Sequence, residues 1–379
     1  MLRSASLGLL FFLSSGCSLF NRVRVDPVAT SFQKPSNVAV YVAVSDGDLA
    51  VTDLQPESFK VYENEQLLDA DDTHQLLLPK ELAAYHHTLL LVDVSGEGSA
   101  DDRLARAVAS FVETVRATQA VSVYAFDGGP NLHAVAEFQK SADTGPVDVR
   151  ALSKWGSADT SRNLNGALLS GLKELDARLA AQAKRVRVGT LVLFTRGSDL
   201  AGRVSQADAE RAVSNTTDDV IALSIAEQTG RTLSDIGKSG VVRAQNEDAL
   251  GTAFEEAALK ARDLYDKHYL IAYCSPARGG SRRLKVEVRF RNREGEDKQG
   301  AFFQDFDATG FGPGCRSESM PRFVPPPVHK PDGHAAAKGT TTNESKPVEA
   351  PVPSGVAEPA PAADDDGVAP PPNKPGYSH

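Results

Sequence analysis

Apolar runs alternate with helix-like segments over most of the middle of the chain, between residues 86 and 274. The run TLLLV at 88–92 is nearly continuous, as in a parallel strand covered on both faces. Helical spacing of apolar residues follows at Leu104, Val108, Phe111, Val112 and Val115. Further strands are expected at 120–126, 132–138, 186–195, 220–226, 241–244 and 268–274, and further helices at 163–182, 205–213 and 247–267. The alternation predicts an α/β fold with a doubly wound, mostly parallel sheet, whose ligands bind beyond the carboxyl ends of the strands.

The flanks of this region have the pattern of antiparallel strands. Apolar and polar residues alternate at 37–45 (NVAVYVAVS) and at 284–290 (LKVEVRF), as in half-exposed strands. We expect an N-terminal β-unit at 34–80, and strands within 281–311 that pack with it as one small antiparallel β-unit.

Proline is concentrated at the C-terminal end, where 14 of the 22 prolines fall in the 59 residues 321–379. Alanine, glycine and the acidic run at 364–366 fill much of the remainder. Such a composition buries too little apolar surface to fold alone. We therefore expect a disordered, Pro/Ala-rich tail at 321–379.

The first 16 residues have the form of an export signal, with a positive charge at Arg3, an apolar core at 7–13 and small residues before Cys17. The stretch LSSGC resembles the bacterial lipobox, although its apolar residue lies four places before the cysteine, where three is usual. The resemblance implies a signal peptide at 1–16 and a lipoprotein whose Cys17 carries acyl chains such as palmitate, followed by a tether at 17–33. Ser18 implies the outer membrane. The alternative is an ordinary signal peptide with a chance cysteine.

Only Cys274 and Cys315 remain if Cys17 is lipidated. In an exported chain, two such thiols most simply form a disulfide bond, and two free thiols are the alternative. Closing this loop would stabilise the fold by about 4 kcal/mol in the chain-entropy model.

The net charge of −9, from 50 acidic and 41 basic residues, argues against nucleic acid as a partner and against an electrostatic grip on anionic lipid. No Gly-x-Ser-x-Gly nucleophile motif occurs, and neither Cys274 nor Cys315 has an obvious base partner. These observations argue against an enzyme. His86 and His87 would point to opposite faces of a strand, so we expect surface histidines and no shared metal.

Three segments, LLLVDVSGE, TSRNLNGALLSGL (160–172) and LVLFTRGSD (191–199), resemble in order and spacing the signature segments of the von Willebrand factor type A domain. The resemblance covers 86–274 and implies a module for protein–protein interaction or adhesion. In that family, a D-x-S-x-S loop, a threonine and a second aspartate bind a divalent cation such as Mg²⁺, which prefers oxygen ligands.

This chain keeps only part of that ligand pattern. Asp93 and Ser95 match, but Glu97 stands at the second serine, Arg162 at the threonine and Arg196 at the final aspartate, three residues before Asp199. A divalent ion about 4 Å from a guanidinium would be repelled by about 8 kcal/mol at an effective dielectric near 20.

Arginine cannot lose its proton to avoid this repulsion. We therefore predict that Arg162 and Arg196 pair with Asp93 and Glu97 in place of a metal, so that no cofactor binds. The alternative is that both arginines face solvent.

The sequence thus predicts a non-enzymatic, lipid-anchored protein of the bacterial cell envelope. Its type A-like domain would bind an unidentified envelope protein through Asp93, Ser95, Glu97, Arg162, Arg196 and Asp199, without a metal. Two alternatives stay open: a metal-dependent adhesin with a remodelled Mg²⁺ site, and a structural tether that acts through the Pro-rich tail.

Overall fold

The computed structural model describes residues 23–96, 98, 101–141, 145–182, 186–225 and 235–323. Its central element is a six-stranded sheet with the order β12-β11-β10-β7-β8-β9. The strands are β7 (Ala84–Asp93), β8 (Ala120–Phe126), β9 (His133–Phe138), β10 (Val186–Thr195), β11 (Asp219–Ile225) and β12 (Val241–Ala244). All neighbours pair in parallel except β8 and β9, which are antiparallel. In chain order this is the 3-2-1-4-5-6 arrangement of a doubly wound sheet, which confirms the predicted fold class.

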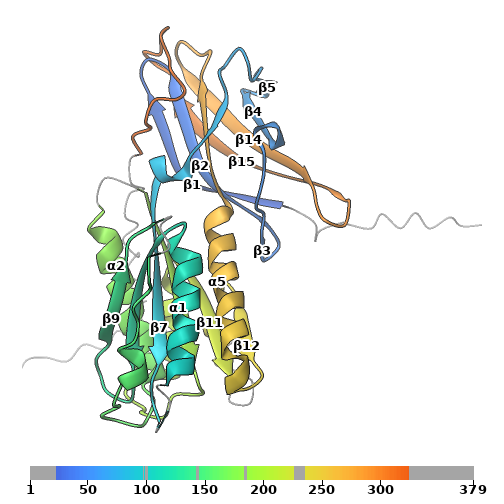
Figure 1. Ribbon diagram of the computed structural model, residues 1–379. Helices are drawn as coiled ribbons and strands as arrows, with labels where there is room; N and C mark the ends of the chain where they lie inside the picture. The colour runs from blue at the N-terminus through green and yellow to red at the C-terminus, as the bar shows by residue number, and fades with distance from the viewer. Residues whose placement is uncertain are drawn as a thin grey trace, which may run out of the picture. The chain divides into compact units, whose positions relative to one another are not determined.

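Helices cover both faces of this sheet. They are α1 (Asp102–Arg116), α2 (Leu164–Ala180), α3 (Gln206–Asn215) and α5 (Leu250–Asp266), with short 3₁₀ turns at η1 (Pro56–Ser58), η2 (Lys80–Leu82), η3 (Leu152–Lys154) and η5 (Glu247–Ala249). Figure 1 shows α1 and α5 side by side, and they share one core with Leu90 and Val92. The alternate residues Leu89 and Leu91 face a second core with α2 and α3. The apolar run at 88–92 is therefore buried on both faces, as its composition predicted.

The starts of α1, α2 and α3 are each fixed by a side-chain cap. The side chains of Asp101, Asn163 and Ser205 accept hydrogen bonds from backbone N–H groups in the first turns of α1, α2 and α3. Such caps satisfy N–H groups that have no partner within the helix. Because these caps directly follow the strand-end loops, they also hold those loops in place.

The flanking segments form two antiparallel sheets. One contains β1 (Val23–Gln33), β2 (Asn37–Asp46), β3 (Leu49–Ala50), β6 (Leu76–Leu78) and β13 (His268–Cys274), and the other contains β4 (Phe59–Glu63), β5 (Gln66–Leu67), β14 (Ser281–Arg291) and β15 (Asp297–Asp307). Their inner faces share one core that includes Val40, Val286 and Phe306. We call these two sheets the β-sandwich and the remainder the α/β unit, which is inserted in the chain between β6 and β13.

Two sequence-based expectations are wrong here. The strand at 268–274 was expected in the parallel sheet, but β13 pairs antiparallel with β2 and β6. The tether expected at 17–33 is wrong for residues 23–33, because β1 pairs along β2 and buries Val23 and Val25. Proline within β1 and a bulge between Pro27 and Ala29 interrupt the alternation that would have revealed this strand.

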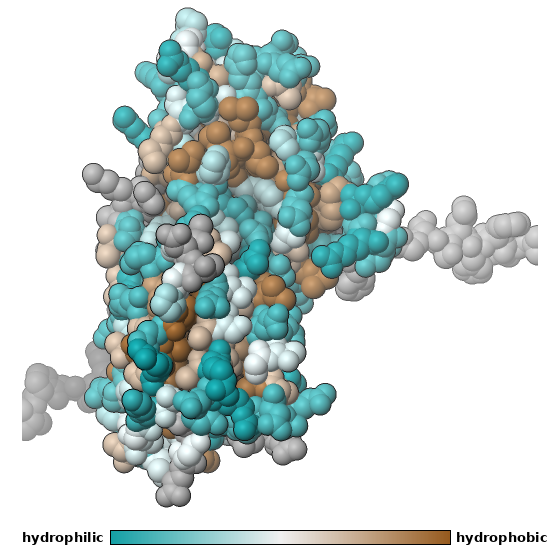
Figure 2. All heavy atoms as spheres, in the orientation of Figure 1, coloured by the Kyte–Doolittle hydropathy of each residue, from teal (hydrophilic) through white to brown (hydrophobic). Residues whose placement is uncertain are grey.

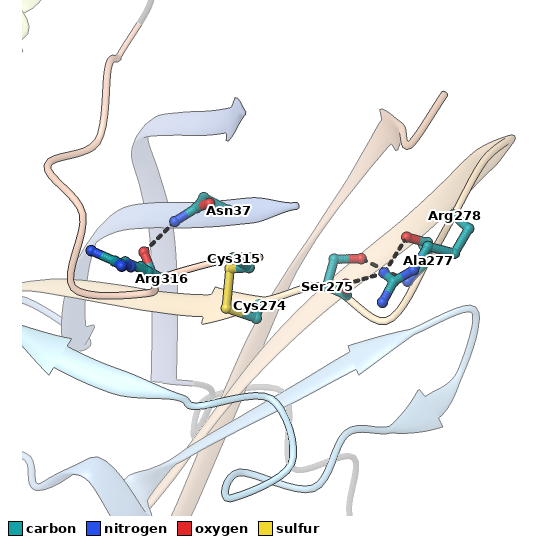
Figure 3. The surroundings of a disulfide bond; sticks show 7 residues. All are labelled: Asn37, Cys274, Ser275, Ala277, Arg278, Cys315 and Arg316. Carbon is teal, nitrogen blue, oxygen red and sulfur yellow. Dashed lines mark hydrogen bonds between the residues drawn. A yellow bond between two sulfur atoms is a disulfide. The ribbon is translucent and has the colours of Figure 1, made fainter. Parts of the chain in front are cut away.

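A disulfide bond between Cys274 and Cys315 joins the end of β13 to the segment after β15, which confirms the predicted pair (Figure 3). Beside it, the Asn37 side chain donates a hydrogen bond to the Arg316 carbonyl. Further along, Ser31 Oγ donates to the Arg322 carbonyl over 3.0 Å. The segment after β15 is thus attached to β1 and β2 by side-chain contacts.

The predictions for the signal peptide, for Cys17 and for the tail beyond residue 323 lie outside the described residues. Within the described part of the chain, no helix is both long and apolar enough to cross a membrane. On the face drawn in Figure 2, hydrophilic side chains cover most of the surface and hydrophobic ones form smaller patches.

Candidate functional site

Three loops meet at the carboxyl ends of the central strands β7 and β10. The parallel register pairs Phe194 with Val92, so the next residues, Thr195 and Asp93, lie beside each other at the strand ends. Asp93 and Thr195 have no exposed surface, and Ser95 is almost fully buried. The sequence placed Asp93 and Ser95 at such a strand end, and the structure brings Thr195 to them.

The Asp93 carboxylate accepts five hydrogen bonds. Oδ1 accepts from the Ser95 backbone N–H at 3.0 Å and from Ser95 Oγ at 2.6 Å. Oδ2 accepts from Arg162 Nε at 2.6 Å, from Thr195 Oγ1 at 3.0 Å and from the Arg196 backbone N–H at 2.9 Å. A carboxylate offers about four lone-pair directions, so these donors occupy its acceptor capacity.

Arg162 connects all three loops. Its guanidinium pairs with Asp93 and donates through Nη1 to the Ser198 carbonyl over 3.1 Å. Its own carbonyl accepts from the backbone N–H groups of Leu200 and Ala201 at 2.8 and 2.9 Å. The side chain is 12% exposed, so the ion pair with Asp93 is largely shielded from water. This part of the predicted cluster is present.

Arg196 makes a contact that the sequence did not predict. Its guanidinium pairs with Glu247, in the turn before α5, and lies 5.5 Å from the centre of the Phe194 ring. Only its backbone N–H contacts Asp93. The sequence predicted that the two arginines pair with Asp93 and Glu97. Arg162 pairs with Asp93, whereas a contact between Arg196 and Glu97 stays a prediction, because Glu97 lies outside the described residues. The alternative in which both arginines face solvent is wrong, because both side chains are mostly buried.

Asp199 lies next to this cluster without joining it. Its Oδ2 accepts from the Asn165 backbone N–H at 3.0 Å, in the first turn of α2, and its Oδ1 accepts from Gly202 at 2.8 Å. A carboxylate at this position stabilises the helix start, where the backbone carries partial positive charge. Asp199 thus holds the third loop against α2.

A second set of contacts, which the sequence did not reveal, fixes the loop after β8. Asp127 accepts from the Gly129 N–H at 2.8 Å, and Asp159 accepts from Ser161 Oγ at 2.6 Å. Gly128 lies between them so closely that a Cβ there would meet Ser161 Oγ at 2.1 Å. A glycine is therefore required for this close approach.

His86 and His87 are both buried, so the expectation of surface histidines is wrong. His87 Nε2 lies 2.9 Å from Ser122 Oγ, and its Nδ1 lies 3.1 Å from the Tyr85 hydroxyl. Burial, and then the nearby Arg178 guanidinium, lowers the pKa of His87 to about 4. Ser122 itself has no exposed surface, so we interpret the His87–Ser122 hydrogen bond as a buried structural contact within the sheet. The two residues lie directly before a buried apolar run, which was the available signal for burial.

The chemistry of the strand-end cluster differs from that of an open metal site. Among the described residues, no three His, Cys, Asp or Glu side chains are grouped so that they could hold a metal ion. The oxygens that gather are those of Asp93, Ser95 and Thr195, and the Arg162 guanidinium already occupies the position facing them.

Comparison with known proteins gives no match to a family model and none to a curated protein. Among solved structures, the chain is similar to a von Willebrand factor type A protein from Catenulispora acidiphila, at 12% identity and a TM-score of 0.37, over 79% of this chain and 75% of that one. It is similar to proximal thread matrix protein 1 from the mussel byssus, with a zinc-occupied MIDAS motif, at 14% identity and a TM-score of 0.35, over 53% of this chain and about half (49%) of the mussel chain. A third is the manganese-loaded Plasmodium vivax TRAP protein, at 11% identity and a TM-score of 0.33, over 66% of this chain and 98% of the Plasmodium chain.

Proposed function

We propose that this chain, whose α/β unit has the von Willebrand factor type A fold, is a non-enzymatic protein-docking module that recognises its partner through side chains and needs no metal ion. The observation that carries the proposal is the Asp93 carboxylate, which already accepts five hydrogen bonds, one of them from a guanidinium. The guanidinium supplies the positive charge that a cation would otherwise bring to this buried carboxylate.

The loops around the cluster form a rigid surface for a partner. Arg162 fixes the third loop through Ser198, Leu200 and Ala201, so that little loop ordering remains to oppose binding. Leu200 is 68% exposed on this loop, and Arg203 is exposed beside it. Arginine is enriched among the residues that dominate protein interfaces, and the exposed leucine beside it adds apolar surface that a partner can bury. We call the Ser198, Leu200 and Arg203 surface the strand-tip face.

Titration calorimetry with Mg²⁺ and with Mn²⁺ tests the absence of a metal. We expect no saturable heat from the purified full chain. The double variant R162T/R196D, which restores the oxygen ligands of the family pattern, is expected to gain saturable binding because it removes both guanidinium groups. Saturable heat in the unaltered chain that is lost in D93A would instead support the metal-dependent adhesin.

Crosslinking in intact cells, followed by capture of the full chain, tests docking at the strand-tip face. We expect L200D and R203E to lose the captured partner. The matched control is L259D, which alters an exposed leucine elsewhere, on α5. A chain that lacks residues 321–379 should keep its partner. Loss of the partner in that deletion alone would favour the tether.

Lipid anchoring through Cys17 in the outer membrane is part of the same proposal and rests on the sequence of the first 18 residues. Two or three acyl chains give durable anchoring, whereas one chain is marginal. We expect the chain to sediment with outer membranes and C17S to be released into the soluble fraction. Equal membrane association of C17S would contradict the anchor.

A further inference from the structure

Two buried histidines face each other where the β-sandwich meets the α/β unit. His86 belongs to β7 and His268 to β13, and their ring centres lie 5.1 Å apart in an edge-to-face arrangement. The Tyr41 hydroxyl, from β2, hydrogen-bonds with His86 Nε2 over 2.6 Å, and the Tyr41 ring stacks on His268. Tyr265 of α5 packs edge-to-face with His86, with the two ring centres 4.7 Å apart. We call Tyr41, His86, Tyr265 and His268 the histidine joint.

The charges around the joint oppose its protonation. The charged and titratable groups that face the two imidazoles are Lys80 and Glu81 of η2, Lys140, Asp219 of β11, Tyr265 and Asp266 of α5, Lys267, and Tyr41 of β2. The three carboxylates are already paired, Asp266 with Lys80, Glu81 with Lys140 and Asp219 with Lys267. Nδ1 of His268 has no partner within hydrogen-bond geometry among the described residues, and the Tyr265 carbonyl nearby raises the pKa of His268 less than burial and Lys267 lower it. Two protonated rings at this distance would therefore repel each other without a carboxylate to offset the charge.

The shift in the two pKa values agrees with this geometry. Burial, and then the ring of His268, holds the pKa of His86 well below its ordinary value. Burial, and then Lys267, lowers the pKa of His268 to about 3. Both rings are therefore neutral at pH 7 in the closed joint.

Apolar packing at the joint is slight compared with the cores on either side. The buried cluster around Tyr41 has seven members, and five of them are alanines, at 29, 39, 83, 84 and 272. The β-sandwich and the two faces of the central sheet each have a larger core of their own. Each of those larger cores is built from residues of one part alone, so we expect each to persist when the joint opens.

We propose that the histidine joint is an acid-sensitive latch: protonation of His86 and His268 at acidic pH separates the β-sandwich from the α/β unit while both stay folded. Each histidine that becomes solvated on opening favours the open form by up to about tenfold per pH unit. With an ordinary histidine pKa of about 6.5, the two together shift the equilibrium by about 600-fold between pH 7 and pH 5.

Hydrogen exchange of the full chain at pH 7 and pH 5, corrected for intrinsic rates, tests the latch. We expect the two connections between the parts, at 80–83 and 265–268, to exchange up to several hundred times faster at pH 5 in the unaltered chain, because their amides are protected by local turns and not by either sheet. Protection at 89–92 and 284–288, in the separate cores, should stay. The variant H86Q/H268F, which cannot titrate but keeps a partner for Tyr41 and a ring against it, should change less than about threefold.

Two controls separate the latch from other acid effects. H74N alters an exposed histidine of the β-sandwich, and H87Q alters a buried one that faces Ser122, so both should open like the unaltered chain. If the double variant does not fold, H268F alone should show about half the logarithmic pH dependence. Three results would overturn the proposal. The exchange rate could be the same at pH 7 and pH 5 in the unaltered chain, it could rise equally in H86Q/H268F, or it could rise in every strand together.

Discussion

Replacing Arg162 by alanine removes the guanidinium from a carboxylate that has no exposed surface. Asp93 keeps four neutral donors, from Ser95, Thr195 and the Arg196 backbone, so its negative charge is still stabilised in part by hydrogen bonds. Breaking a buried ion pair from one side costs about 3–5 kcal/mol. The remaining donors put R162A at the lower end, about 3 kcal/mol, which corresponds to a fall in Tm of about 6–12 °C for a unit of this size.

Urea denaturation of R162A, D93N and the double variant measures this coupling. D93N alone leaves Arg162 without its anion, so both single changes destabilise the fold. The double variant leaves neither charge unpaired, and we expect it to be at least about 2 kcal/mol more stable than the sum of the single effects. R211A, which breaks an exposed pair with Asp208, should leave the urea midpoint nearly unchanged. Additive effects of R162A and D93N would refute the idea that the guanidinium neutralises this carboxylate.

Three other predictions follow from particular contacts. The pKa of His87 is about 4 in the folded chain and about 6.5 in the unfolded chain, so folding favours the neutral imidazole. Its titration does not change the free energy of unfolding above pH 6.5, and about 3 kcal/mol of stability is lost as pH falls from 6.5 to 4. H87Q should therefore show a shallower fall in urea midpoint over that range. The double variant C274S/C315S, which opens a loop with a sequence separation of 41, should lose about 4 kcal/mol of unfolding free energy, and an equal midpoint for oxidised and reduced unaltered chain would argue against this. A Cβ at Gly300 would lie 2.1 Å from the Val23 carbonyl, so G300A should push β1 from β15 and cost about 2 kcal/mol or more, whereas G251A, at an open position on α5, should be neutral or stabilising in the same thermal melts.

The strand-end cluster was predictable in part. Asp93 and Ser95 follow an apolar run, and that local pattern is enough to place them at the tip of a buried strand. Arg162 could be matched to the same place because the order of the three segments fixes which loops meet. The contact of Arg196 with Glu247 could not be foreseen, because Glu247 reaches it from a turn 51 residues further along the chain.

The parallel sheet could be predicted because its strands β7, β8 and β11 are buried on both faces and are therefore apolar over most of their length. The same apolar pattern led to the wrong sheet for β13, whose residues HYLIAYC are also buried on both faces. Its partner strand β2 lies more than 200 residues earlier, and no local signal says which sheet a buried strand joins. The burial of His86 was missed for a related reason, since its neighbours Tyr41 and His268 come from that distant pair of strands.

The insertion of the α/β unit between β6 and β13 has a mechanical consequence. Both ends of that unit enter the β-sandwich, where β1 and the final described segment are tied together through Ser31 and Arg322 and the Cys274–Cys315 bond secures β13. Tension between the two flanks of the chain would be borne by these ties, and the inserted unit would carry almost none of it. Force reaches the parallel sheet only when something pulls on its strand ends, so the load path through the molecule is set by what is bound there.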